Sequence, residues 1–132
     1  MPKTITQKVV FKNTTPETLY DLYMDAKEHA ASTGAPVKIT KKEGASYSVH
    51  DGYITGINLH LVPGKMIVQT WRGNDWKKSD PDSIFTLLFE KDAKDAILYM
   101  THANLPADQE EGIQSGWKEF YWKPWKTYLA KK

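Results

Sequence analysis

The sequence predicts a single α+β domain in which a curved antiparallel β-sheet wraps around one long C-terminal helix. Polar and apolar residues alternate in short segments between residues 37 and 104, a pattern typical of strands. Turn residues join these segments by short connections, which favours an antiparallel meander. After Pro106 the apolar period becomes helical, and a sheet with one apolar face needs such a helix as its cover. The chain of 132 residues suits one domain, so we assign residues 1–132 to it.

The N-terminal segment predicts one strand followed by two short helices. Thr4–Lys12 alternates between polar and apolar residues, as a half-buried strand does. Thr15-Pro16-Glu17 then combines a hydroxyl N-cap, a proline at the first helical position and an acid in the first turn. Gly34 marks the end of the second helix, because glycine readily adopts the left-handed conformation found at helix C-termini.

Further strand candidates bring the sheet to about six or seven strands. The candidates are Val37–Lys41, Ala45–Val49, Tyr53–Val62, Met66–Arg72, Ser83–Glu90 and Ala96–Ala103. The connection at Pro63-Gly64 leaves two registers open. A two-residue turn would be of type II, which splays the strands of a hairpin. A longer loop is favoured, and it would place Ile57, Leu61, Ile67 and Trp71 together.

The segment Ala107–Lys131 predicts the long helix. Acidic residues come early and lysines late, an order that complements the helix dipole. Pro124 removes one backbone hydrogen bond, so we expect a kink there. Gly112 and Gly116 each cost about 1 kcal/mol relative to Ala inside a helix. Close approach of another backbone, or room for a ligand, would offset that cost.

Composition and charge exclude several classes of protein. Hydrophobic residues make up 40% of the chain, too many for a disordered protein. The chain has no cysteine, which excludes disulfides and thiolate chemistry. The net charge of +2 does not favour nucleic acid or an anionic membrane as a partner. Since no apolar run approaches the length of a membrane span, we expect a cytoplasmic protein.

Several motifs resemble those of the family of activators of heat-shock protein 90 ATPase. They are Ile54-Thr55-Gly56, Leu61-Val62-Pro63-Gly64, Ile67-Val68-Gln69-Thr70-Trp71-Arg72, Trp76, His102-Ala103-Asn104-Leu105-Pro106, Gly116-Trp117 and Tyr121-Trp122. The resemblance covers almost the whole chain. It implies the START-type, pollen-allergen-like helix-grip (SRPBCC) fold, with a hydrophobic cavity between the sheet and the long helix. In eukaryotic co-chaperones this domain is the C-terminal half of a longer protein, and this chain resembles the stand-alone bacterial form. His50 stands where relatives usually carry an aromatic residue, which makes the cavity more polar if that position lines it.

The predicted cavity lining comes from the strands and the last helix. Along Ser83–Glu90, alternation alone places the large aromatic residues on one face. The next strand is ambiguous by alternation, and the family pattern favours the row that contains His102. The candidate ligand-binding residues are Trp71, Phe85, Leu87, Phe89, Leu98, Met100, His102, Ile113, Trp117 and Tyr121.

The polar residues do not form a recognisable catalytic or metal motif. His29, His50 and His60 lack the spacing of a metal site, so we expect no metal and no cofactor. His102 could orient a ligand, or it could be a strand-end histidine satisfied by the backbone or by water. Trp122 and Trp125 could meet a partner or pack within the fold. Arg72 should point to the opposite sheet face and form an ion pair.

Three functions remain open from the sequence. The first is binding of a small hydrophobic ligand in the cavity, with His102 orienting the polar end of the ligand. The second is a co-chaperone-like module that acts on a heat-shock protein 90-type ATPase, which follows from the resemblance. The third is a cavity enzyme of the superfamily, although the sequence shows no catalytic residues. We expect a monomer.

Overall fold

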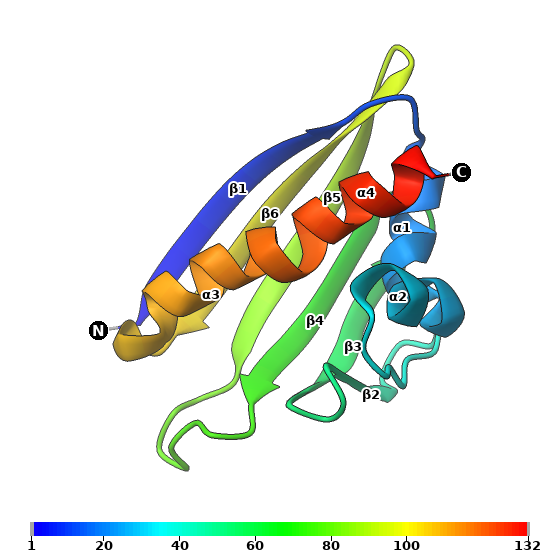
Figure 1. Ribbon diagram of the computed structural model, residues 1–132. Coiled ribbons are helices and arrows are strands. Elements are labelled where there is room, and N and C mark those ends of the chain that lie inside the picture. The colour runs from blue at the N-terminus through cyan, green and yellow to red at the C-terminus, as the bar shows by residue number, and fades with distance from the viewer. Residues whose placement is uncertain (1, 132) are drawn as a thin grey trace.

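The computed structural model describes residues 2–131, and its core is one antiparallel sheet of six strands (Figure 1). The strands are β1 (Lys3–Phe11), β2 (Ser46–Val49), β3 (Ile54–Val62), β4 (Met66–Gly73), β5 (Ser83–Asp92) and β6 (Asp95–Leu105). Their order is β1-β6-β5-β4-β3-β2, so the chain runs as a meander from β2 to β6 and β1 closes the far edge. The predicted fold class is confirmed. The first and last residues of the predicted domain lie outside the described residues.

One predicted strand is absent and one hairpin has an unexpected irregularity. The segment Val37–Lys41 is not a strand and makes only an isolated bridge from Lys38 to Ser48. The loop after β3 has the favoured longer form, because Val62 pairs with Met66 across it. However, a bulge follows Asn58 in β3, and this extra residue moves Ile57 to the outer face, where it is 45% exposed. The prediction that Ile57 joins the inner row was therefore wrong.

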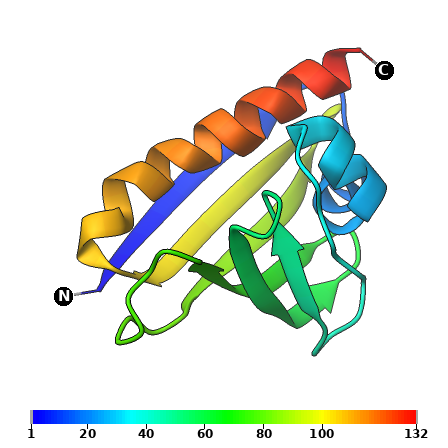
Figure 2. The same cartoon turned by 60° about the horizontal axis from the view of Figure 1, so that its bottom comes forward.

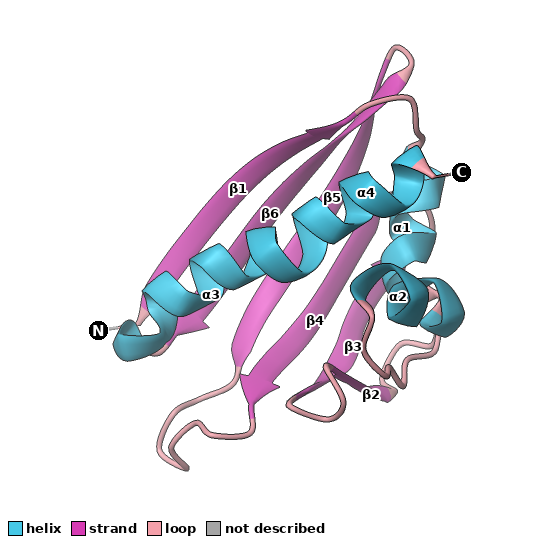
Figure 3. Ribbon diagram, in the orientation of Figure 1, coloured by secondary structure: helices cyan, strands magenta, loops and turns pink. Residues whose placement is uncertain are grey.

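The helices cover one face of the sheet (Figure 3). Helix α1 (Pro16–Met24) begins at Thr15, whose side-chain oxygen accepts a hydrogen bond from the Thr18 N–H at 3.1 Å. Helix α2 (Ala26–Thr33) ends at Gly34, which has a left-handed φ of 79°. Both helix ends are as predicted. These two helices lie beside the C-terminal end of the long helix (Figure 1).

The long C-terminal helix passes through a π-helical turn. It comprises the 3₁₀ turn η1 (Ala107–Gln109), α3 (Glu110–Trp117), the π-helix η2 (Lys118–Trp122) and α4 (Lys123–Ala130). Within it the Lys123 N–H donates to the Lys118 carbonyl, five residues back. The turn widens directly before Pro124, where the missing N–H disturbs the ordinary pattern. The helix runs alongside β1 and β6, while the strands around β3 curl forward (Figure 2).

The inner face of the sheet forms the core with the helices. Phe85, Leu87 and Phe89 of β5 are buried, whereas Ile84 and Leu88 are exposed on the outer face. Alternation therefore identified the inner row of β5 correctly. In β6 the row favoured by the family pattern is also the buried one, and it comprises Leu98, Met100 and His102.

Candidate functional site

A cavity of about 470 Å³ lies between the long helix, strand β4 and the connection from β2 to β3. The helix contributes one wall and the sheet the other, which is the location expected for a cavity in a helix-grip fold. Its lining is largely aromatic, and within residues 2–131 it carries no carboxylate, ammonium or guanidinium group. The lining residues are His50, Tyr53, Ile54, Trp71, Trp76, Gln109, Gly112, Ile113, Gly116, Trp117, Phe120 and Tyr121.

The two helical glycines open the cavity on the side of α3. A Cβ atom at Gly112 would have no heavy atom within 4 Å, so no other backbone approaches there. A Cβ atom at Gly116 would lie 3.7 Å from the Phe120 ring, an ordinary contact distance. Of the two explanations for these glycines, close backbone approach is excluded at Gly112. The space beside it belongs to the cavity.

His50 lines the cavity and has open hydrogen-bonding capacity. It follows β2 with a left-handed φ of 53°, a conformation that His adopts more readily than most residues. Its ring lies 5.7 Å from the Phe120 ring and 5.4 Å from the Tyr121 ring. Among residues 2–131, neither ring nitrogen has a hydrogen-bond partner. Burial lowers the pKa of His50, so at neutral pH the ring is uncharged.

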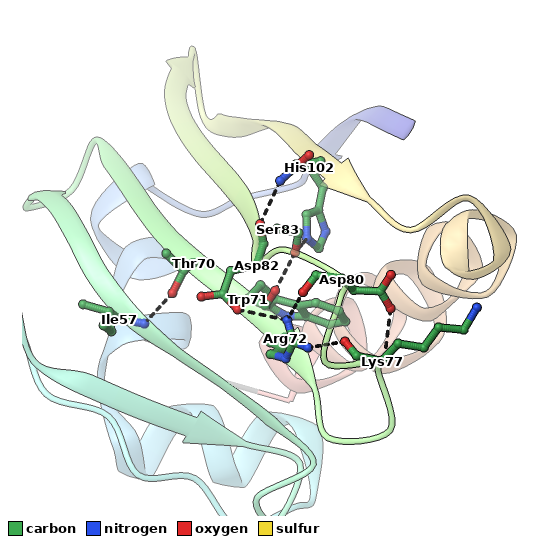
Figure 4. A network of polar contacts seen from close by, with 10 residues as sticks. Ile57, Thr70, Trp71, Arg72, Lys77, Asp80, Asp82, Ser83 and His102 are labelled. Atoms are coloured by element: carbon green, nitrogen blue, oxygen red, sulfur yellow. Dashed lines mark hydrogen bonds and ion pairs between the residues drawn. The ribbon is translucent and has the colours of Figure 1, made fainter. Parts of the chain in front are cut away.

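His102, by contrast, is bonded at both ring nitrogens, and Figure 4 shows its contact with Ser83. The Trp117 indole N–H donates to Nδ1 at 3.0 Å, which makes Nδ1 an acceptor. Nε2–H therefore donates to the Ser83 hydroxyl at 2.8 Å, and that hydroxyl donates to the Trp71 carbonyl at 2.6 Å. Burial lowers the pKa of His102 to about 3. The predicted role of orienting a ligand is therefore wrong, because this ring has no free nitrogen to offer.

His29 forms a second buried chain behind the cavity. Its Nδ1–H donates to the Tyr23 carbonyl at 2.7 Å, which leaves Nε2 to accept from the Tyr121 hydroxyl at 2.9 Å. Burial lowers the pKa of His29 to about 4. The ring thus holds Tyr121, one of the cavity walls, in place.

The predicted lining residues divide into two groups. Trp71, Ile113, Trp117 and Tyr121 all line the cavity. The others lie deeper, where aromatic side chains from the helices fill the interior; the Trp117 ring, for instance, lies 5.2 Å from the Phe85 ring. These core residues, which do not line the cavity, are Phe85, Leu87, Phe89, Leu98, Met100 and His102.

Sequence reasoning did not place several lining residues. Gly112 and Gly116 were singled out for their cost in a helix, and His50 as a departure from the family. Trp76 lies in the loop after β4, and its position depends on Arg72. The Arg72 guanidinium donates to the Lys77 and Asp80 carbonyls, both at 2.5 Å, which folds that loop back (Figure 4).

The structure also shows where Arg72, Trp122 and Trp125 lie and what they contact. Arg72 forms the expected ion pair, with Asp82 at 3.3 Å. Trp122 and Trp125 are buried within the fold, and the Trp122 indole N–H donates to Gln7 at 2.6 Å.

In residues 2–131 no three metal-ligating side chains come together. No helix in that range is long and apolar enough to cross a membrane. Monomeric state and cytoplasmic location stay predictions.

Residues 13–130 match the family described as activator of Hsp90 ATPase homolog 1-like protein. The chain belongs to this family. A human member, activator of 90 kDa heat shock protein ATPase homolog 1, is 33% identical over 119 residues. A homologue from Dictyostelium discoideum is 32% identical over 117 residues. The matches cover 90% and 88% of this chain but only 35% and 30% of those relatives, so the chain spans about a third of their length.

Solved structures share the fold of this chain. An HSP90 activator from Plasmodium falciparum superposes with a TM-score of 0.85 at 25% identity, covering 98% of this chain and 96% of that one. Two more distant structures share the fold. The Aha1 dimer from Colwellia psychrerythraea has a TM-score of 0.78 at 15% identity, covering 92% of both chains. Ara h 8.0201 has a TM-score of 0.78 at 11% identity, covering 100% of both.

Proposed function

We propose that this protein binds a small hydrophobic ligand in the cavity between the sheet and the C-terminal helix. The observation that carries the proposal is the open space beside Gly112 in a cavity whose lining is largely aromatic. A volume of about 470 Å³ falls within the range typical of small-molecule sites. Two glycines inside a helix weaken it, and a binding function explains why the space they leave is kept.

The binding energy would come from burial of apolar surface. A ligand that loses about 300 Å² of apolar surface to the cavity gains roughly 7 kcal/mol at ~25 cal/mol per Å². Lost translational and rotational freedom opposes this gain. The walls are already positioned, since hydrogen bonds hold Trp117 and Tyr121. Since a dissociation constant of 1 μM requires about 8 kcal/mol, we expect weaker binding, with dissociation constants from about 0.1 to 1 mM, for ligands that fill the cavity.

The test is a ¹H–¹⁵N NMR titration with lipids, sterols, flavonoids and aromatic metabolites. Saturable shifts are expected in residues 50–54 and 109–121, which border the cavity. Gly112→Leu would fill the space and should abolish binding. Gln114→Leu is the matched control, because it adds the same side chain to an exposed position of the same helix. Equal affinity in Gly112→Leu and wild type, or no shifts with any ligand, would contradict the proposal.

A second candidate function is contact with a heat-shock protein 90-type ATPase. The specific observation is the match to a Plasmodium falciparum chain named as an HSP90 activator, over nearly the full length of both chains. The human and Dictyostelium relatives carry the same name but are about three times as long. The assay is the ATPase rate of the 90-kDa chaperone from the same organism. No change in rate at saturating protein would count against this function, and Gly112→Leu separates a surface effect from a cavity effect.

A further inference from the structure

We infer that His50 selects the ligand, and that the cavity takes a neutral, planar aromatic molecule whose hydroxyl group donates a hydrogen bond to the His50 ring. This inference rests on the proposed function and specifies its ligand class. Three features carry it: the ring arrangement of the walls, the absence of charge in the lining, and the state of each polar group that faces the space.

The walls favour a flat aromatic ligand. Trp71 and Trp76 stand together on the sheet side, with ring centroids 5.7 Å apart. Trp117 and Tyr121 stand together on the helix side, with centroids 5.0 Å apart. Aromatic rings gain from offset-stacked and edge-to-face contacts in addition to their area burial. A planar molecule between these pairs can make such contacts on both sides, whereas a flexible alkyl chain cannot.

The lining also favours a neutral ligand. No lining residue is acidic, lysine or arginine. The guanidinium nearest the aromatic wall, Arg72, lies 5.8 Å over the Trp76 ring and is bonded to the loop carbonyls. A charged ligand group would lose its hydration without gaining a counter-charge, which is strongly unfavourable. The cavity therefore discriminates against carboxylates and amines.

Among the lining side chains of residues 2–131 that can accept a hydrogen bond, His50 has an unbonded ring that lies against two other rings; the Trp71 and Trp76 indoles offer only donors. The Tyr53 hydroxyl already donates to Asp75 at 2.7 Å. Gln109 lies on the first turn of the helix and has a long side chain with several rotamers. His50 has an unbonded ring held between the rings of Phe120 and Tyr121. In its neutral form one ring nitrogen is an acceptor, which a ligand hydroxyl can reach as a donor.

The probes are 2-naphthol and 2-methylnaphthalene, which have nearly the same shape and differ in one hydroxyl. Their dissociation constants are measured by NMR titration on wild type and on His50→Phe, which keeps an aromatic ring at this position. We expect the affinity ratio of 2-naphthol to 2-methylnaphthalene to fall about three- to tenfold in His50→Phe, as one hydrogen bond is lost. Tyr53→Phe is the matched control and should change the ratio less than twofold.

A measurement on wild type covers the case in which His50→Phe does not fold. Addition of 2-naphthol should shift the ¹⁵N resonances of the His50 ring, because the ligand hydroxyl forms a hydrogen bond with one ring nitrogen. Addition of 2-methylnaphthalene, which has no hydroxyl, should not produce this shift. Three results would overturn this inference while the proposed cavity function stands. They are an affinity ratio of the two probes that is unchanged in His50→Phe, ¹⁵N resonances of His50 that do not move with 2-naphthol, and tighter binding of 2-naphthoate than of 2-naphthol. If neither naphthalene probe nor any other ligand binds, the proposed function itself fails.

Discussion

Lowering the pH from 7.5 to 5.5 should destabilise this protein, because two buried histidines are held neutral. His29 and His102 are fully buried, and each uses one ring nitrogen as a donor and the other as an acceptor. A protonated ring would present a donor to the Tyr121 hydroxyl or to the Trp117 indole N–H, respectively. Burial accordingly lowers the pKa from 6.5 to about 4 for His29 and to about 3 for His102.

The sign and size of the change in the free energy of unfolding follow from proton linkage. Since both pKa values are lowered in the folded state, the unfolded chain binds more protons between pH 3 and 6.5, and stability rises with pH in that range. At pH 5.5 an unfolded histidine is about nine-tenths protonated, whereas both folded rings stay neutral. Each ring then contributes about 1.4 kcal/mol of lost stability relative to pH 7.5, or about 3 kcal/mol together. The pKa of His50 is also lowered by burial, so it adds to the same trend.

Urea denaturation at half-unit pH steps measures this effect, with NMR titration of the histidine rings as the direct readout. His29→Gln should remove about 1.4 kcal/mol of the drop. Ile67→Val, a buried apolar change, should lower stability equally at every pH. A total drop below about 1 kcal/mol, or a His102 ring that titrates above pH 5.5, would refute the reasoning.

Further substitutions test the packing. Ser83→Ala leaves the His102 Nε2–H without its acceptor and should lower the free energy of unfolding by about 1–3 kcal/mol. Calorimetry should show this as a fall in Tm of ~3–10 °C. Ser46→Ala, at an exposed position, is the control. Gly56→Ala should cost about 3 kcal/mol in urea denaturation, because its Cβ would overlap the Thr70 carbonyl and approach the Tyr47 ring to 2.6 Å. Gly112→Ala meets open space and should instead stabilise the protein by about 1 kcal/mol; a loss of stability would show that the helix geometry there excludes a side chain.

The elements that local physics determines were predictable from the sequence. The Thr15 cap, the left-handed Gly34 and the alternation in β5 each depend on residues close together in the chain. The errors lie where a distant contact decides. Whether the segment after Pro36 becomes a strand depends on how much of it pairs with β2, and only Lys38 does. The bulge after Asn58 depends on the buried Asn58 side chain, which donates to the Thr40 and Lys42 carbonyls.

The candidate site was predictable in outline but not in its chemistry. The helical glycines indicated either close backbone approach or empty space, and four of the predicted residues, Trp71, Ile113, Trp117 and Tyr121, lie on the walls of the cavity. The roles of the histidines could not be read from the sequence. His102 and His50 differ because Trp117 and Ser83 bond to the His102 ring, whereas no hydrogen-bonding group of residues 2–131 bonds to the His50 ring. Ser83 comes from β5, which pairs with the strand of His102, and Trp117 comes from the long helix that crosses the sheet. The spacing of these residues along the sequence does not reveal either contact.

The buried hydrogen bonds of His102 and His29 explain why the cavity can remain open without a ligand. An unfilled apolar space is unfavourable, so large side chains tend to close it by changing rotamer. Trp117 is held on two sides, by its hydrogen bond to His102 and by stacking on Trp122 at 5.3 Å and 15°. Tyr121 is held by its bond to His29. Collapse of either wall would leave a buried histidine nitrogen unsatisfied, a cost of about 1–3 kcal/mol. The two buried histidines, His29 and His102, therefore help to keep the cavity open, whereas the unbonded His50 faces the cavity itself.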